Sequence, residues 1–285
     1  MNLGFFFMNW FTSWSDVDFT EVNQLDVNAF ALTAINTFVI DENGNVWYTD
    51  NFDEWVDAEI TANAIAPSPL GDYLVYTDGS DDIYLLDVAA ATSTQLGTET
   101  ASIVTTNVNL DVYIITTSGT LKSYDSVGDS WDVVAFTPGT SPQKLSIDSL
   151  GQPWVVDGEG DLYYRSNDDD TWYLALEFYN EDPDVTITAN EDNFNVNDVS
   201  VTFEGAIWIT AELTDDEGNT MNLPMQLKPF TTDWVDVGNE GTGVTASNIF
   251  RVGMWQDVDD MPVISKLWLF GSIMGGVIDG MITSA

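Results

Sequence analysis

Short acidic loops recur along the first two thirds of the chain, and their side-chain oxygens have the chemistry that Ca²⁺ requires. The loops read DENGN at 41–45, DGSDD at 78–82, DGEGD at 157–161 and DDD at 168–170. The candidate ligands are Asp41, Asn43, Asn45, Asp78, Asp81, Asp157, Asp161, Asp168 and Asp170. We expect no obligatory cofactor, with Ca²⁺ or another divalent cation as the ion that fits. Asp-Gly turns are also ordinary hairpin connectors, which leaves a purely structural role open.

Aromatic residues lie in the apolar runs beside these loops. Exposed rings next to Asp and Asn can bind a sugar or a protein partner. The candidate ligand-binding residues are Trp47, Tyr48, Tyr84, Trp154, Tyr163, Tyr164 and Trp208. The alternative is that these rings pack between neighbouring sheets, because large aromatic side chains dominate protein cores.

The residue types that are missing exclude most catalytic chemistry. The chain has no His and no Cys, so it has no Ser-His-Asp triad, no thiolate nucleophile and no His- or Cys-ligated metal. A pair of carboxylates, as in glycosidases, is an acid–base device that such a chain can still build. Because 47 acidic residues are present, no single pair stands out. The sequence therefore predicts a non-enzymatic protein, with a carboxylate-based glycosidase as an alternative.

The charge of the chain limits its partners. The 285 residues include 47 acidic and six basic side chains, which gives a formal charge of −41. With so few cations, we expect neither nucleic acid nor an anionic membrane surface as a partner. The longest apolar run, at 267–278, spans 12 residues, whereas a membrane span needs roughly 20. Residues 1–14 contain no Lys or Arg, so we expect no signal peptide and no membrane insertion.

The acidity does not indicate disorder. Hydrophobic residues make up 44% of the chain and aromatic residues 13%, which is enough apolar surface to bury a core. Of the acidic residues, 34 are Asp and 13 are Glu, and Asp favours turns where Glu favours helices. High Asp with very low Lys is also a halophile pattern, so a viral, a cellular or a halophilic origin stays open.

A repeated order of short strands dominates the sequence. Runs of Val, Ile, Thr, Tyr and Trp are broken by Gly, Asp and Asn, and no window shows helical periodicity. Four segments share an apolar strand, a turn, a further strand and an acidic loop that usually ends in Trp. The strands after the turn open at Val46, Ile83, Leu121 and Leu162, spaced by 37, 38 and 41 residues. A period near 40 with about four strands is typical of a β-propeller blade.

The fold class predicted is therefore all-β: one domain, 1–285, folded as a β-propeller of four-stranded blades. The strand pattern after Trp172 predicts six blades. The length of that segment alone predicts seven, so seven blades are the alternative. The polar stretches 181–197 and 215–219 are expected to be insertions. Residues 5–14 align with 46–55 without gaps, so the chain begins inside a blade. We expect residues 1–15 to complete the C-terminal blade and to close the ring by pairing of the N- and C-terminal segments.

Two sets of residues resemble known propeller families. SYDSVGDSW at 123–131 and SNDDDTW at 166–172 resemble degenerate Asp boxes of sialidase-like propellers, and 41–50 and 148–164 resemble tectonin-type lectin repeats. The resemblance implies a propeller fold and a structural box, in which Asp closes a tight turn and Trp packs between blades. Sialidase chemistry implies three arginines, and this chain has only Arg165 and Arg251.

These observations favour a structural or interaction module within an extracellular, virion-surface or virion-tail assembly. Its expected partners are other protein subunits of the assembly, which can include further copies of the chain. A carbohydrate-binding, lectin-like propeller with glycans as partners is the alternative. The missing nucleophiles, the absence of Cys and an acidic surface suited to high ionic strength support this interpretation.

Overall fold

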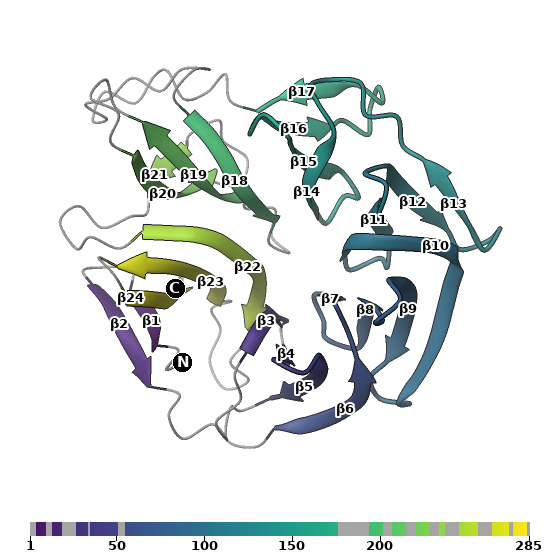
Figure 1. Ribbon diagram of the computed structural model, residues 1–285, viewed down its shortest axis with the longest axis horizontal. Helices are drawn as coiled ribbons and strands as arrows, with labels where there is room; N and C mark the ends of the chain where they lie inside the picture. Colours follow the sequence, from purple (N-terminus) through teal and green to yellow (C-terminus); the bar gives the residue numbers. More distant parts are fainter. Residues whose placement is uncertain are drawn as a thin grey trace.

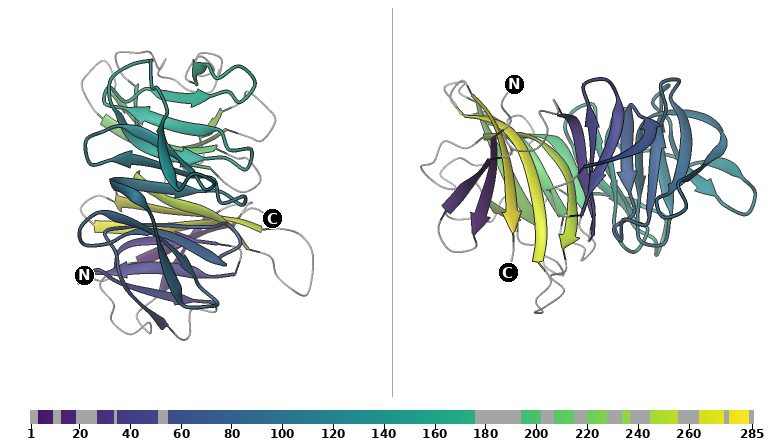
Figure 2. Two further views of the ribbon diagram at one scale, coloured as in Figure 1. Left: turned by 90° about the vertical axis from the view of Figure 1, so that its right-hand side faces the viewer. Right: turned by 90° about the horizontal axis from the view of Figure 1, so that it is seen from below.

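The computed structural model describes residues 4–9, 13–18, 27–33, 35–50, 55–175, 194–201, 207–214, 220–227, 234–236, 245–255, 264–273 and 276–283. Within these ranges the chain forms strands, turns and bends, which confirms the all-β prediction. No helix that could span a membrane occurs in this part of the chain. The sheets follow one another around a common centre (Figure 1). Views turned by 90° show the strands of each sheet lying next to one another (Figure 2).

Three of the sheets are simple antiparallel meanders of four strands in chain order. The first contains β3 (Val27–Leu32), β4 (Thr37–Asp41), β5 (Asn45–Thr49) and β6 (Val56–Thr61). The second contains β14 (Pro142–Ile147), β15 (Pro153–Asp157), β16 (Leu162–Arg165) and β17 (Trp172–Leu174). The third contains β18 (Phe194–Val201), β19 (Ile207–Thr214), β20 (Thr220–Leu227) and β21 (Trp234–Asp236).

A seven-stranded sheet joins two such meanders through one long strand, β10 (Thr92–Thr106). Its first part pairs with β9, and from Ala101 onward it pairs with β11. The strand is therefore the last of one four-stranded unit and the first of the next. The other members are β7 (Ala64–Pro67), β8 (Tyr73–Thr77), β9 (Asp82–Asp87), β11 (Val112–Thr116), β12 (Leu121–Asp125) and β13 (Ser130–Val133).

The remaining sheet combines the two ends of the chain. Its order is β2-β1-β24-β23-β22, with β1 parallel to β24 from Phe5↔Asp279 to Met8↔Ile282. β1 is also antiparallel to β2 over six residue pairs. The strands are β1 (Gly4–Asn9), β2 (Ser13–Asp18), β22 (Thr245–Trp255), β23 (Ile264–Ile273) and β24 (Gly276–Thr283).

The core lies between the sheets because the second strand of each of the first five units is buried on both faces. In β8, Leu74 belongs to the core cluster of Phe38, whereas its neighbour Val75 belongs to that of Ile114. Successive side chains of a strand point to opposite faces, so a continuous apolar run serves two interfaces. The strands after the turn contribute Val46, Ile83, Leu121 and Leu162, which are all fully buried. Burial of each such side chain contributes roughly 1.5–3 kcal/mol to the stability of the folded state.

Tryptophans at the start of the outer strands fasten neighbouring units together. The indole N–H of Trp131 donates to the Leu96 carbonyl at 3.0 Å, and that of Trp172 donates to the Ala135 carbonyl at 2.8 Å. In each case the acceptor belongs to the preceding unit. Gly97 has φ +59°, and a Cβ there would lie 2.8 Å from the Trp131 ring. These two tryptophans therefore contribute to packing between units.

The structure changes one predicted boundary. Residues 194–197, expected to end a polar insertion, form the start of β18, where Phe194 and Val196 are buried in the core. Alternating apolar residues in this stretch supply one face of a strand despite its many Asn and Asp residues. The rest of that stretch, 181–193, and the second expected insertion, 215–219, lie outside the described residues.

Candidate functional site

The turns of the first four units gather at two opposite ends of the sheets. The first-turn end holds the turns between first and second strands, at 33 and 35–36, 68–72, 107–111 and 148–152. The turns between third and fourth strands lie at this end too, since Asn167 Nδ2 donates to the Leu150 carbonyl at 2.7 Å. The second-turn end holds the turns between second and third strands, at 41–45, 78–82, 116–120 and 157–161.

At the second-turn end, predicted calcium ligands cap their own turns. Asp41 Oδ1 accepts the backbone N–H groups of Asn43 and Asn45, both at 2.8 Å, and Oδ2 accepts Asn45 Nδ2 and Trp47 Nε1. Burial raises the pKa of Asp41, but these hydrogen bonds outweigh it and hold the pKa below its ordinary value. Asp41 is therefore an anionic turn residue.

The same arrangement recurs in two further units. Asp78 Oδ1 accepts the N–H groups of Ser80 and Asp82, at 2.8 and 3.1 Å. Asp157 Oδ1 accepts those of Glu159 and Asp161, at 2.9 and 3.0 Å. Repetition of one carboxylate-to-backbone pattern supports the hairpin-connector alternative for these loops.

The nine predicted calcium ligands do not form one site. Asp168 and Asp170 lie at the first-turn end, in the turn between β16 and β17, whereas the others lie at the second-turn end in three different units. Asp81 accepts a hydrogen bond from Asn63 Nδ2 at 2.9 Å, which links its turn to the residue just before β7. Calcium binding by these residues stays a prediction.

One group of three acids within the described residues has the spacing of a cation site. Oxygens of Asp157, Glu159 and Asp161 lie within 4.8 Å of one another. Tyr163 donates to Asp161 Oδ2 at 3.3 Å, and burial followed by the charges of Asp161 and Asp157 raises the pKa of Tyr163 to about 12. The local potential is strongly negative, which suits a hard divalent cation.

Replacing Asp157 by Ala is expected to lower the free energy of unfolding by about 2–3 kcal/mol, because three backbone N–H groups lose a charged acceptor. These are the amides of Glu159, Asp161 and Thr140, the last at 2.8 Å from Oδ2. Urea unfolding measures the change without adding salt. Asp168→Ala, at an exposed position, is the control and should stay within about 0.5 kcal/mol of the parent. Equal losses in both variants would contradict the turn-capping role.

The predicted ligand-binding aromatics are placed mainly by packing. Trp154 and Trp208 are only 6% and 3% exposed, so they differ from the prediction of a surface site and belong to the interior. Trp154 belongs to a core cluster with residues of the next sheet, such as Phe194 and Val196. The other five are partly buried: Trp47, Tyr48, Tyr84, Tyr163 and Tyr164.

A ladder of stacked rings crosses the sheet of β14–β17. Trp154 and Tyr164 have ring centroids 5.0 Å apart, and Tyr164 and Tyr173 5.5 Å apart. The strand register places these residues opposite one another. Tyr173, at the outer edge, is 41% exposed and donates to Asp169 Oδ2 at 2.7 Å. The ladder therefore ends in an exposed ring beside a carboxylate.

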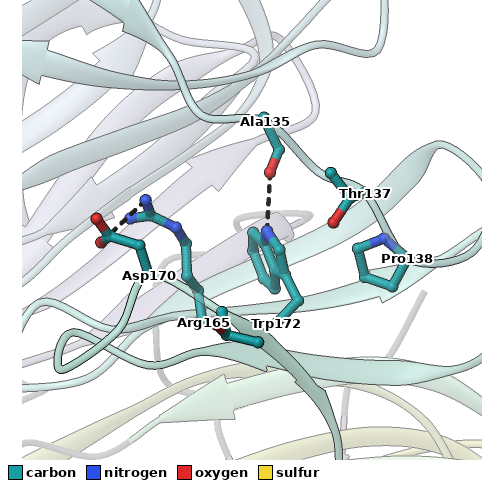
Figure 3. A pocket seen from close by; sticks show the side chains of 7 residues that line it. Ala135, Thr137, Pro138, Arg165, Asp170 and Trp172 are labelled. Carbon is teal, nitrogen blue, oxygen red and sulfur yellow. Dashed lines mark hydrogen bonds and ion pairs between the residues drawn. The ribbon is translucent and has the colours of Figure 1, made fainter.

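A cavity of about 380 Å³ lies beside this sheet, where the chain crosses from β13 to β14 (Figure 3). It is lined by Ala135, Thr137, Pro138, Arg165, Asp170, Thr171 and Trp172. Arg165 and Asp170 form an ion pair at 3.0 Å, with side chains 24% and 73% exposed. An exposed pair of this kind contributes less than about 1 kcal/mol, so a bound group can replace either partner at small cost.

The cavity combines a cation, an anion, hydroxyl groups and an indole. Figure 3 shows the Trp172 ring between the ion pair and Pro138, held by its bond to Ala135. The chemistry suits a short peptide segment, since it offers charge, hydrogen bonds and an aromatic surface together. None of the lining residues except Asp170 was a predicted site residue. Arg165 carried a usable signal, because it is one of only two arginines and adjoins a run of three acids.

No family model matches the chain, and no curated protein matches it. Many solved structures share its fold. One is a structural genomics protein of unknown function from Bacteroides thetaiotaomicron, with 9% identity and TM-score 0.59, covering 93% of this chain and 72% of that one. The WD40 repeats of RRP9 have 11% identity and TM-score 0.54, covering 91% and 82%. The extracellular domain of a putative hybrid two-component system from B. thetaiotaomicron has 12% identity and TM-score 0.55, covering 93% and 34%. At these identities the likeness concerns the fold alone, which is propeller-like.

Proposed function

We propose that the sheets are the six blades of a closed propeller, with β10 shared by the second and third blades. Four blades precede residue 176, β18–β21 form the fifth, and the five-stranded sheet forms the sixth. The pairing of β1 with β24 supports closure, because it joins the first strand of the chain to the last. A ring covers both faces of every sheet, which an isolated four-stranded sheet cannot achieve.

We further propose that this propeller is a non-enzymatic interaction module that binds protein partners. The observation that carries this proposal is the cavity of Arg165, Asp170 and Trp172, with its weak ion pair and fixed indole. The carboxylates that the sequence offers for catalysis support it as well, because several are already engaged as turn caps. The WD40 repeats among the similar structures are consistent with such a role.

An extracellular or virion-surface location belongs to the same proposal. A charge of −41 keeps copies of the chain apart and is tolerated best where salt screens it. One similar structure is an extracellular domain. In this setting the partners are other subunits of the assembly.

Selection of a displayed random-peptide library against the immobilised protein tests the interaction proposal. We expect enriched peptides whose affinity falls at least about tenfold with Arg165→Ala, since the guanidinium lines the cavity. Lys122→Ala is the matched control, because Lys122 forms an ion pair with Glu99 at 2.7 Å and does not line the cavity. Peptides that ignore Arg165→Ala would contradict the role of the cavity. A failure to enrich any peptide would contradict the interaction proposal, and turnover of aryl glycosides would favour the glycosidase.

The aromatic ladder makes a lectin the second candidate. Its exposed member, Tyr173, lies beside Asp169, and a ring next to a carboxylate is the arrangement that holds a sugar. In that case a glycan array would show binding, and Tyr173→Ala would remove it. Glycan binding without any selected peptide would favour this candidate over the interaction module.

A further inference from the structure

The first-turn end carries exposed apolar side chains, and the second-turn end carries none in its four described turns. Ile35, Leu70 and Leu150 are 59%, 49% and 73% exposed, in the first turns of three different units. The opposite turns read DENGN, DGSDD, TTSGT and DGEGD. Single exposed apolar residues need no explanation, but these three occupy equivalent positions in the first, second and fourth units, which places them on one surface.

The turn of the third unit has Asn109 at this position and carries a partly buried apolar residue, Leu110, one position later. Leu110 has φ +61°, in the left-handed region that non-glycine residues seldom adopt. Its N–H donates to the Asn107 carbonyl at 3.1 Å, as Gly71 and Gly151 donate to the equivalent carbonyls of their turns. Glycine thus occupies this position in the neighbouring units. Leu110 therefore adopts a strained backbone conformation where two neighbouring units use glycine, which is the reason for including its side chain in this surface.

Hydrogen bonds between neighbouring turns hold the surface in place. Asn36 Nδ2 donates to the Gly71 carbonyl at 3.2 Å, which joins the first and second units. Asn107 Nδ2 donates to the Asp148 carbonyl at 3.3 Å, which joins the third and fourth. A surface fixed in this way loses little entropy when a partner binds.

Acidic side chains stand beside the apolar ones. Asp72 follows Leu70 by two positions and Asp111 follows Leu110 by one, and both carboxylates are exposed. Residues 55–175 contain 19 acidic and three basic side chains, and two of the three cations are in ion pairs. Apolar contact here therefore requires a partner that also compensates negative charge.

We propose that the first-turn end, through Leu70, Leu110 and Leu150, docks a protein surface that combines apolar side chains with Lys or Arg. This inference rests on the proposed interaction function and names the partner's chemistry and the surface that meets it. Charge complementarity identifies the occupant. A second copy of the chain brings a further charge of −41 and is repelled, whereas a basic partner is attracted to the acidic surface.

The test compares two synthetic peptides of equal positive charge, one of Lys and Leu and one in which Ser replaces every Leu. Fluorescence anisotropy measures the affinity of each peptide for the intact protein. About 0.15 M NaCl in the buffer screens the charges and so limits binding that depends on charge alone. We expect the Leu peptide to bind about tenfold more tightly. The double variant Leu70→Ser/Leu150→Ser should reduce this difference to less than about twofold, and Leu110→Gly should reduce it in part.

Val133→Ser is the matched control. Val133 is 65% exposed, but it pairs with Lys122 at the start of β12, near the second-turn end, so the peptide preference should persist. Unchanged urea midpoints show that the variants remain folded, as exposed positions allow. Equal affinities for the two peptides, or a preference lost with Val133→Ser alone, would overturn the docking surface. Neither of these two results changes the outcome of the peptide-library selection, in which binding depends on Arg165. The docking surface can therefore be refuted while the proposed interaction function stands, and the reverse.

Discussion

A chain that lacks residues 1–18 is expected to show no cooperative unfolding transition. The deletion removes β1 and β2, two of the five strands in the sheet that also holds β22–β24. It exposes β24 as an unpaired edge and leaves the sheet of β22–β24 incomplete. The loss is comparable to the whole stability of a domain, about 5–15 kcal/mol. Tryptophan fluorescence in a urea series measures it.

Adding residues 1–18 as a separate peptide is the control for this deletion. If β1 contributes by pairing with β24, the peptide should restore a cooperative transition in a concentration-dependent manner. A truncated protein with the parent urea midpoint would refute the role of the N-terminal strands. Such a result would also remove the main support for a closed ring.

The melting temperature is expected to climb markedly between ~10 mM and ~1 M NaCl, as the Debye length falls from about 30 to 3 Å. The 47 negative charges greatly outnumber the six positive ones and repel one another over the whole surface, and screening relieves that repulsion in the folded state most. Differential scanning calorimetry across the salt series measures the effect. A flat series would mean that the carboxylates are already compensated.

Calcium chloride at matched ionic strength separates screening from binding. If Asp157, Glu159 and Asp161 hold the ion, millimolar Ca²⁺ should raise the melting temperature beyond the NaCl value. Glu159→Gln/Asp161→Asn should then remove this excess and leave the NaCl response intact. An excess that survives the double variant would assign Ca²⁺ binding to other carboxylates.

The repeating strand order could be predicted from the sequence because it is local. An apolar run, a Gly/Asp turn and a second apolar position, such as Ile83, predict the same hairpin of two strands in each unit. The burial of Val46, Ile83, Leu121 and Leu162 follows from this pattern. The boundary at 194–197 could not be predicted, since a strand rich in Asn and Asp reads as a loop unless its alternating burial is known.

The candidate site could be predicted only in part, because it depends on contacts between distant segments. Arg165 meets Asp170 within one hairpin, but the wall at Ala135 comes from the preceding unit. Likewise, the sequence does not distinguish Trp154, which is covered by the next sheet, from Tyr173, which ends the ladder in solvent. Burial of an aromatic residue is set by its neighbours in space, which spacing along the chain does not give.

The long strand β10 has a mechanical consequence. Its backbone runs without a hairpin from one sheet into the next, with register shifts between Gln95 and Thr100 and between Ala101 and Ile103. Elsewhere in the first four units a segment outside any strand connects two sheets, whereas here one strand belongs to both. We therefore expect the second and third units to unfold together, because neither can lose its part of β10 without disturbing the other.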